Sequence, residues 1–286
     1  MIYKRSLHPI ASPGGVICLL ALDHREAMRN AFRRAGVEDV NANEMLETKS
    51  RIVEAVGPSA TGVLLDHAAA RVSRPDGIGL LVPLEEQGHE QLDGARLNRL
   101  EFTAEDALRI GADGCKLLLH YRPDHLASAQ RQREVVARAA DDCHRQGLPL
   151  VLEPLVYRLD GESEGAYTNA FADLVVRSAS DLADSGADIL KLQYPGDFAA
   201  CARLTVAASP LRWALLGGSE VDGETFAAAL EAACRAGASG FMAGRTIWGG
   251  ALGLDSTAQQ LWLVEHARPL FERLSAIAHD HARRIW

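Results

Sequence analysis

The chain has 286 residues, of which 48% are hydrophobic and 24% are charged. This length suits one barrel of alternating strands and helices and is enough to bury a large core. The formal net charge of −8, without a run of basic residues, argues against a nucleic-acid-binding surface. The five cysteines have no CxxC spacing, the N-terminus lacks the apolar core of a signal peptide, and no apolar run has the length of a membrane span. We therefore expect a cytoplasmic protein that binds neither nucleic acid nor membrane.

Eight short apolar runs recur along the chain, and amphipathic segments separate most of them. The runs are hydrophobic almost without alternation, which is typical of strands covered on both faces in a parallel sheet. We expect strands at 16–23, 61–66, 79–85, 114–120, 148–156, 187–194, 211–218 and 239–245. No linker or change of composition divides the chain. The pattern predicts an α/β fold, a (β/α)8 TIM barrel formed by a single domain over residues 1–286.

The region 67–100 fits this pattern least well. The polar segment 85–99, EEQGHEQLDGARLNR, follows the third expected strand at a place where a helix is expected. We interpret this segment as a loop of the active site.

Two lysines lie in apolar strands, Lys116 in GCKLLLHY and Lys191 in DILKLQYP. Lysine is seldom buried without a partner, and a desolvated amine loses proton affinity and becomes nucleophilic. Together with the carboxylate of Glu153 in VLEP, the two amines can form an active site that makes an imine. The alternative is that each lysine lies at a solvated strand end or in a structural ion pair.

Further polar residues stand at the carboxyl ends of the expected strands, where a TIM barrel carries its active site. They are Asp23, His24, Arg25, Asp66, His67, Glu85, His120, Gln193, Gly217, Gly218, Ser219, Gly244 and Arg245. The backbone N–H groups of the last two loops, together with the Arg245 guanidinium, suit a phosphate group. As an alternative, Asp23, Asp66 and Ser219 could each only cap a helix.

As an alternative, the two Asp-His pairs at 23–24 and 66–67, together with His120, could supply nitrogen and oxygen ligands to a metal ion. Because neighbouring residues of a strand point to opposite faces, we expect only one member of each pair to face the barrel axis. The chain also has no HExxH motif. We therefore expect no metal and no cofactor.

The segments ALDHREAM, LLDH, CKLLLHYR, VLEP, LKLQYP and AGASGFMAGRTIW, in this order and spacing, resemble a family of class I aldolases. The family comprises tagatose-1,6-bisphosphate aldolases and bacterial sulfofructose-1-phosphate aldolases, and the resemblance runs from Val16 to Gly253. It implies that Lys191 forms the Schiff base and that Glu153 is the acid/base. It also implies that Lys116 assists and that Asp23 is the carboxylate of the first strand. The chain departs from the family at His24, where Gln is usual, and in the turn LLGGSEVD.

The resemblance implies a metal-independent aldolase that cleaves a ketose 1-phosphate to dihydroxyacetone phosphate and a three-carbon aldehyde. The substrate is of the 6-deoxy-6-sulfofructose 1-phosphate or tagatose 1,6-bisphosphate type. The substrate-binding set is His24, Arg25, Asp66, Gln193, Gly217, Gly218, Ser219, Gly244 and Arg245, with Arg25 at the far anionic group. We expect a phosphorylated sugar as the partner molecule and assembly as a homo-oligomer. The alternatives are a TIM-barrel sugar-phosphate lyase or isomerase without an imine, and a non-catalytic sugar-phosphate-binding protein.

Overall fold

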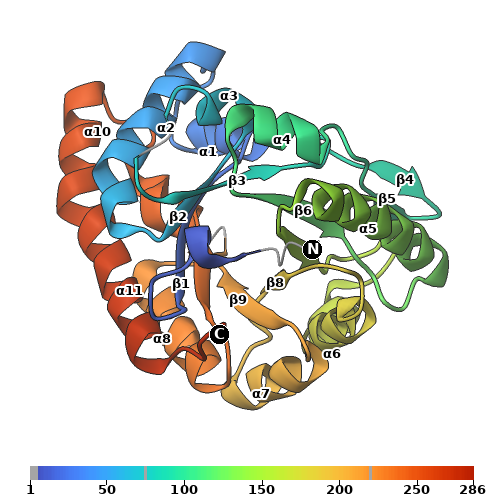
Figure 1. Ribbon diagram of the computed structural model, residues 1–286. Helices are drawn as coiled ribbons and strands as arrows, with labels where there is room; N and C mark the ends of the chain where they lie inside the picture. Colours follow the sequence, from blue (N-terminus) through green and yellow to red (C-terminus); the bar gives the residue numbers. More distant parts are fainter. Residues whose placement is uncertain (1–5, 74–75, 219–220) are drawn as a thin grey trace.

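Eight parallel strands close into a barrel in the computed structural model, which describes residues 6–73, 76–218 and 221–286 (Figure 1). Around the barrel, the strand order is β1-β10-β9-β8-β7-β6-β3-β2. The strands are β1 Ile17–Leu22, β2 Gly62–Leu65, β3 Gly79–Pro83, β6 Gly114–His120, β7 Leu150–Leu155, β8 Ile189–Leu192, β9 Arg212–Leu216 and β10 Gly240–Ala243. Each lies within one of the eight apolar runs, so the predicted TIM barrel is confirmed.

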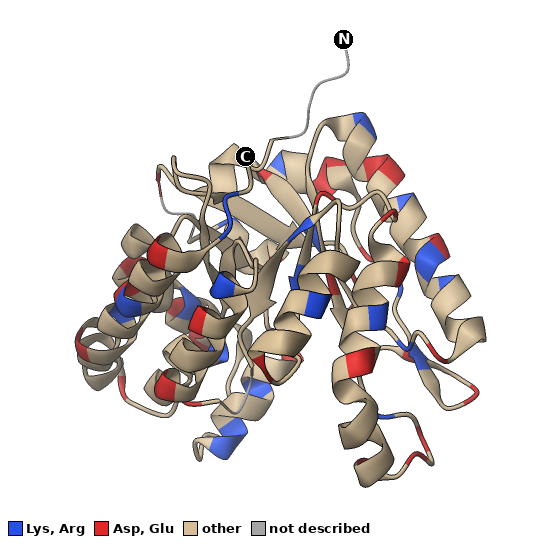
Figure 2. Cartoon of the chain, turned by 90° about the horizontal axis from the view of Figure 1, so that it is seen from below, with Lys and Arg blue, Asp and Glu red and all other residues tan. Residues whose placement is uncertain are grey.

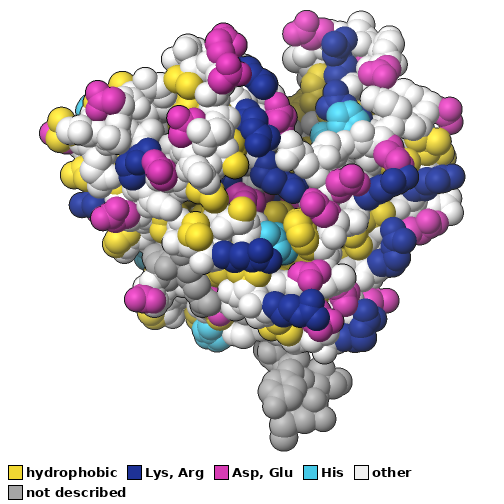
Figure 3. Space-filling view, turned by 90° about the horizontal axis from the view of Figure 1, so that it is seen from above, with side chains coloured by type: hydrophobic (Ala, Val, Ile, Leu, Met, Phe, Trp, Pro, Cys, Tyr) yellow, Lys and Arg dark blue, Asp and Glu magenta, His cyan; other side chains and the backbone are white. Residues whose placement is uncertain are grey.

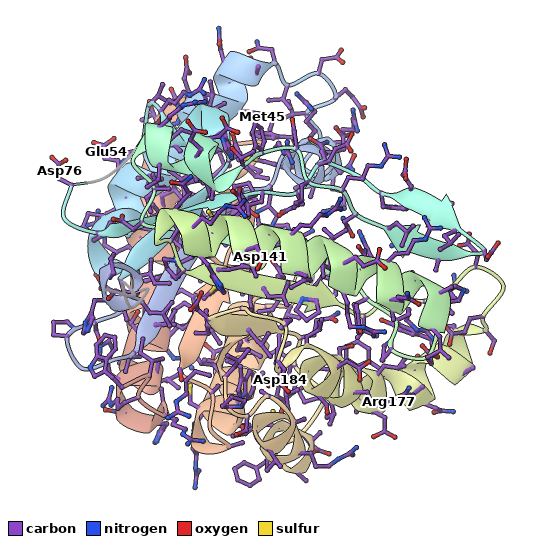
Figure 4. The ribbon with its side chains drawn as sticks, turned by 45° about the vertical axis from the view of Figure 1, so that its right-hand side comes forward. Met45, Glu54, Asp76, Asp141, Arg177 and Asp184 are labelled. Atoms are coloured by element: carbon purple, nitrogen blue, oxygen red, sulfur yellow. The ribbon has the colours of Figure 1, made fainter. Side chains whose placement is uncertain are left out.

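Helices surround the barrel wall, and acidic and basic residues are interspersed along them (Figure 2). They are α1 Glu26–Arg34, α2 Ala42–Val56, α3 His67–Ala70, α4 Ala104–Ile110, α5 Leu126–Gln146, α6 Glu164–Leu182, α7 Phe198–Ala207, α8 Gly223–Arg235, α9 Arg245–Trp248, α10 Ser256–Trp262 and α11 Arg268–His281. Short 3-10 turns lie at His8–Ile10 (η1), Gly57–Ser59 (η2) and Gly249–Ala251 (η3), and a π-helix, Leu263–Ala267 (η4), joins α10 to α11. The long helix α5, marked by Asp141 in Figure 4, crosses the outside of the barrel.

The sequence explains several helix starts through capping side chains. Asn41 before α2 and Thr103 before α4 each accept a hydrogen bond from a backbone N–H of the first turn and form a capping box. No helix in the described ranges is both long enough and apolar enough to cross a bilayer.

Two apolar cores fill the molecule, one inside the barrel and one between the barrel and the helices. The inner core is made by Ile10, Ile17, Leu19, Ala21, Leu64, Leu81, Val151, Ile189, Ala214 and Met242. Because side chains alternate along a strand, the residue two positions beyond an inward one also points inward. Glu153 thus follows Val151, and Lys191 follows Ile189, on the inner face of the barrel.

The polar segment 85–99 contains a β-hairpin, which corrects the expectation of a loop. Strands β4 Glu90–Leu92 and β5 Ala95–Leu97 pair antiparallel, joined by Asp93 and Gly94 at φ 49° and 82°. A two-residue turn with positive φ at both positions favours Asp-Gly, so the signal was present in the sequence.

We expect Gly240→Ala to destabilise the barrel strongly. Gly240 has φ +125° and pairs with Ile17 of β1, and an added Cβ would lie 1.9 Å from the Ile17 carbonyl oxygen. The strained backbone and the clash together should lower the free energy of unfolding by about 3 kcal/mol or more, measured by urea denaturation. The control is Gly161→Ala, at φ +82° with no atom within 4 Å of the added Cβ, which should cost about 1–2 kcal/mol. Equal losses in the two variants would contradict this account.

Candidate active site

A cavity of about 1010 Å³ lies at the carboxyl ends of the barrel strands. Figure 3 shows the molecular surface hollowed at its upper edge, with basic side chains on the wall of the hollow. The predicted site residues that line the cavity are Asp23, His24, Arg25, Lys116, Glu153, Lys191, Gln193, Gly217, Gly218, Gly244 and Arg245. Ser219 lies outside the described residues.

Lys191 and Glu153 face each other across neighbouring strands. The Lys191 Nζ lies 3.0 Å from the Glu153 Oε2, and both side chains are buried. This proximity follows from the parallel register of β7 and β8, in which Val151 stands opposite Ile189. At this distance a proton can pass directly between the amine and the carboxylate.

Lys116 is held by three carboxylates. Its Nζ lies 2.8 Å from Asp23 Oδ2, 2.6 Å from Glu85 Oε1 and 3.2 Å from Glu153 Oε2. Burial acts to lower the pKa of Lys116, but the charges of Asp23, Glu153 and Glu85 outweigh it and raise this pKa well above its ordinary value. Lys116 is therefore an ammonium group at neutral pH.

Glu85 is the site residue to which the sequence analysis gave no role. Its Oε1 accepts from Lys116 and its Oε2 accepts from the backbone N–H of Leu118, at 3.0 Å. Burial, together with the charge of Asp23, raises the pKa of Glu85 despite the opposing charge of Lys116. The available signal was its position, two residues beyond Pro83 at the end of a strand whose inner face enters the site.

Two of the three carboxylates on Lys116, those of Asp23 and Glu85, differ in their ease of protonation. Burial acts to raise the pKa of Asp23 as well, but the charges of Lys116, His24 and Lys191 outweigh burial and lower it. Asp23 is consequently a fixed negative charge in the site, whereas Glu85 accepts a proton more readily.

His24 and Asp23 both line the cavity, although they are neighbours in the sequence. Strand β1 ends at Leu22, and the alternation of side chains ends with it. Burial lowers the pKa of His24 to about 4, against the opposing charge of Asp23. His24 is therefore a neutral imidazole at pH 7, and its ring lies at 75° to that of Trp248, with the ring centroids 5.5 Å apart.

The second Asp-His pair, Asp66 and His67, lies outside the cavity lining, so the structure does not bring Asp66 together with the other expected substrate-binding residues. The Asp66 carboxylate caps α3 by accepting from the backbone N–H groups of Ala68 and Ala69, and it pairs with the buried Lys49. His67 stacks on the ring of Phe102, with centroids 3.6 Å apart. Asp66 keeps the capping role that the sequence analysis left open.

The loops after β9 and β10 approach each other at glycines. A Cβ added at Gly217 would lie 2.8 Å from the Ala243 Cα, and one at Gly244 would lie 2.5 Å from the Ala21 carbonyl oxygen. The hydroxyl of Thr246 donates to the Gly218 carbonyl oxygen at 3.0 Å and joins the two loops. A side chain at Gly217 would clash with the end of β10, and one at Gly244 would clash with β1.

Gln193 lines the cavity, but both polar atoms of its side-chain amide form hydrogen bonds with the protein backbone. Its Oε1 accepts from the backbone N–H of Val156 at 2.7 Å, and its Nε2 donates to the Val156 carbonyl oxygen at 3.3 Å. These bonds continue the strand pairing of β7 with β8 beyond the ends of the strands. Gln193 thus fixes the loop after β7.

The start of the polar segment 85–99 does reach the site, since Glu86, Gln87 and Gly88 line the cavity together with Asn98. The Nδ1 of His120, at the end of β6, lies 3.1 Å from the Asn98 Oδ1. Burial, with His89 and Arg96 nearby, lowers the pKa of His120 to about 3, so this ring is also neutral.

The carboxylates of the site surround an amine. In the described part of the chain, no three or more His, Cys, Asp or Glu side chains are grouped so that they could hold a metal ion. Asp23, Glu85 and Glu153 converge instead on the Lys116 ammonium group, which supplies the positive charge between them.

A parallel barrel with two buried lysines beside three carboxylates at its carboxyl rim suits carbon–carbon bond chemistry through an imine. Residues 17–250 match the model of the family described as DeoC/LacD family aldolase. The chain therefore belongs to the DeoC/LacD aldolase family, as the resemblance implied, and is an aldolase.

Individual relatives agree with this assignment. The chain is 26% identical to tagatose 1,6-diphosphate aldolase 1 of Streptococcus pyogenes serotype M1, over 98% of this chain and 96% of that protein. It is also 26% identical to the enzyme of the same name from Streptococcus mutans serotype c, where the match spans 67% of this chain and 62% of the relative. An archaeal fructose-1,6-bisphosphate aldolase, solved with its catalytic Lys bound to a carbinolamine intermediate, has the same fold. Its TM-score is 0.69 at 20% identity, over 93% of this chain and 96% of that one.

We expect His24→Gln to reduce the acid sensitivity of the fold. Because the pKa of His24 falls from 6.5 to about 4 on folding, protons bind preferentially to the unfolded chain. The stability that neutral His24 contributes is complete above pH 6.5 and is lost as the pH falls toward 4. Between about pH 7 and pH 4.5 the wild type should lose about 2–3 kcal/mol more unfolding free energy than His24→Gln, measured by urea denaturation. Parallel pH profiles for the two proteins would contradict the burial of a neutral ring.

Proposed function

We propose that this chain is a class I aldolase in which Lys191 forms a Schiff base with the C2 ketone of a ketose 1-phosphate. Cleavage then yields dihydroxyacetone phosphate and a three-carbon aldehyde. The substrate is of the tagatose 1,6-bisphosphate or 6-deoxy-6-sulfofructose 1-phosphate type. Support for the lysine comes from the archaeal relative with its covalently bound catalytic Lys, and support for the substrate comes from the tagatose 1,6-diphosphate aldolases.

The observation that carries the proposal is the unequal pairing of the two lysines. Lys116 is in contact with three carboxylates, whereas Glu153 is the carboxylate within ion-pair distance of Lys191 among the described residues. An amine must lose its proton before it can attack a carbonyl carbon. Three surrounding negative charges oppose that loss at Lys116, and Lys191 is the amine that can be freed.

Imine formation begins with transfer of a proton from Lys191 to Glu153, across the 3.0 Å that separates Nζ from Oε2. The neutral amine attacks C2 and gives a carbinolamine. Glu153 returns its proton to the C2 hydroxyl, which leaves as water, and the iminium ion forms.

In the cleavage of the C3–C4 bond, Glu153 acts as a base, whereas it acts as an acid in the loss of water from the carbinolamine. Glu153 removes the proton of the C4 hydroxyl, the aldehyde leaves, and the electron pair of the C3–C4 bond passes into the iminium group to give an enamine. Protonation at C3 and addition of water then release dihydroxyacetone phosphate and regenerate the amine. Lys116 stays charged throughout and holds Asp23 and Glu153 in position.

The two ends of the substrate bind on opposite sides of the barrel. We place the 1-phosphate at Gly217, Gly218, Gly244 and Arg245, in the loops after β9 and β10, as is usual for phosphate in this fold. The guanidinium of Arg25 donates to the carbonyl oxygen of Glu85, just after β3, and β3 lies across the barrel from β9. Arg25 is therefore positioned for the far anionic group.

Borohydride reduction tests the imine directly. With dihydroxyacetone phosphate present, reduction should add the mass of the reduced adduct to the peptide that contains Lys191, as read by mass spectrometry. Lys191→Met should abolish the adduct, and Lys116→Met serves as the matched control that retains Lys191. An adduct on Lys116 would reverse the two roles. Turnover without any adduct would favour a lyase or isomerase without an imine, and binding without turnover would favour a sugar-phosphate-binding protein.

Prolonged dialysis against EDTA should leave the rate of substrate cleavage unchanged. The reason is that the iminium group serves as the electron sink and the Lys116 ammonium balances the buried carboxylates, so the scheme requires no metal ion. The measurement is the initial rate of release of dihydroxyacetone phosphate before and after chelation. A loss of rate that added zinc restores would contradict the scheme.

A further inference from the structure

Arg25 forms an ion pair with Glu101 at the edge of the cavity. The Nη1 of Arg25 lies 2.9 Å from the Glu101 Oε2, and its Nη2 donates to the Glu85 carbonyl oxygen at 3.1 Å. Arg25 lines the cavity, whereas Glu101 is not among the residues that line it. The ion pair therefore links Glu101 to the cavity by way of Arg25.

The backbone places Glu101 independently of the ion pair. Residues 99–101 run antiparallel to 84–86 through a bridge between Glu85 and Leu100. The backbone N–H of Glu101 donates to the Leu84 carbonyl oxygen at 2.9 Å, and that of Glu86 donates to the Arg99 carbonyl oxygen at 2.8 Å. A carboxylate is thus held beside Arg25 whether or not the guanidinium turns toward it.

Solvent exposure separates this ion pair from those at the centre of the site. The side chains of Arg25 and Glu101 are 25% and 40% exposed, whereas that of Lys116 is 2% exposed. An exposed pair gains little from its contact, because water screens the charges. A buried pair cannot be opened without leaving an uncompensated charge. The Arg25–Glu101 pair can therefore exchange its carboxylate for another anion at small cost.

We propose that Glu101 is a specificity-determining residue that competes with the far anionic group of the substrate for Arg25. This inference rests on the proposed function, which places that group at Arg25. A substrate with a phosphate or sulfonate at C6 displaces the Glu101 carboxylate, whereas a substrate with a neutral end leaves the ion pair closed. Glu101 thereby lowers the preference for doubly anionic substrates without touching the reacting atoms.

The competition predicts opposite effects from the two members of the pair. Removing the charge of Glu101 leaves the Arg25 guanidinium for the far anion, so binding of a doubly anionic ligand becomes tighter. Removing Arg25 takes away the group for which both anions compete, so the preference for the second anion is lost. A purely supporting role of Glu101 predicts the reverse of the first effect, because Arg25 would lose the partner that holds it in place.

Calorimetric titration with two ligands that lack a carbonyl group separates binding from imine chemistry. The probes are D-mannitol 1,6-bisphosphate and D-mannitol 1-phosphate, titrated into the wild type, Glu101→Gln and Arg25→Ala. The matched control is Glu105→Gln, which removes the same charge from the exposed pair with Arg109. Glu101→Gln should tighten binding of the bisphosphate about two- to fivefold at low salt and leave the monophosphate unchanged. High salt should reduce this gain, and Arg25→Ala should abolish the preference for the bisphosphate.

Three results would overturn the inference, each in a different way. Weaker bisphosphate binding by Glu101→Gln would show that Glu101 supports Arg25 instead of competing for it. Equal changes for both ligands, matched by Glu105→Gln, would show a general effect of net charge. Failure of the wild type to bind either ligand would overturn the proposed sugar-phosphate site itself, and the role of Glu101 would fall with it.

Discussion

The burial of five charged groups in one barrel mouth is the constraint on which the rest of the structure depends. Charges removed from water are costly unless they meet opposite charges at close range. Asp23, Glu85 and Glu153 meet this requirement around Lys116, with Lys191 on the other side of Glu153. Lys116 is thereby held as a cation, whereas Glu153 is the carboxylate within ion-pair distance of Lys191 among the described residues. In the proposed mechanism, the different roles of the two lysines follow from the carboxylates around them.

The centre and the edge of the site differ in what they can do. At the centre, the closed barrel holds Lys116, Glu153 and Lys191 on the inner faces of β6, β7 and β8, so their relative positions are those of the strands. At the edge, Arg25 and Glu101 come from segments beyond the strand ends and remain partly exposed. In the proposed function, the buried residues of the centre carry the chemistry, and the partly exposed Arg25–Glu101 pair at the edge discriminates among substrates.

The alternation of inward and outward side chains along buried strands explains how much of the fold and of the candidate site could be predicted from the sequence. The eight strands stood out as apolar runs, and Lys191 and Glu153 followed as inward residues of two of them. The sequence is less informative where a strand has already ended, as at His24 and Asp66, because turn geometry and helix capping then decide where a side chain points. The Asp93-Gly94 hairpin carried a local signal that was not used. The convergence of Glu85 on Lys116 depends on the pairing of β3 with β6, and pairing between strands is not visible in a single sequence.

The central claim is that the carboxylate environment selects Lys191 as the nucleophile and keeps Lys116 as a fixed cation. A crystal structure of the protein soaked with dihydroxyacetone phosphate tests this claim most directly. We expect continuous electron density from the Lys191 Nζ to C2 of the ligand, while the Lys116 Nζ keeps its contacts with Asp23, Glu85 and Glu153. A covalent bond from Lys116 to the ligand would contradict the account, and so would a ligand bound with C2 remote from both amines.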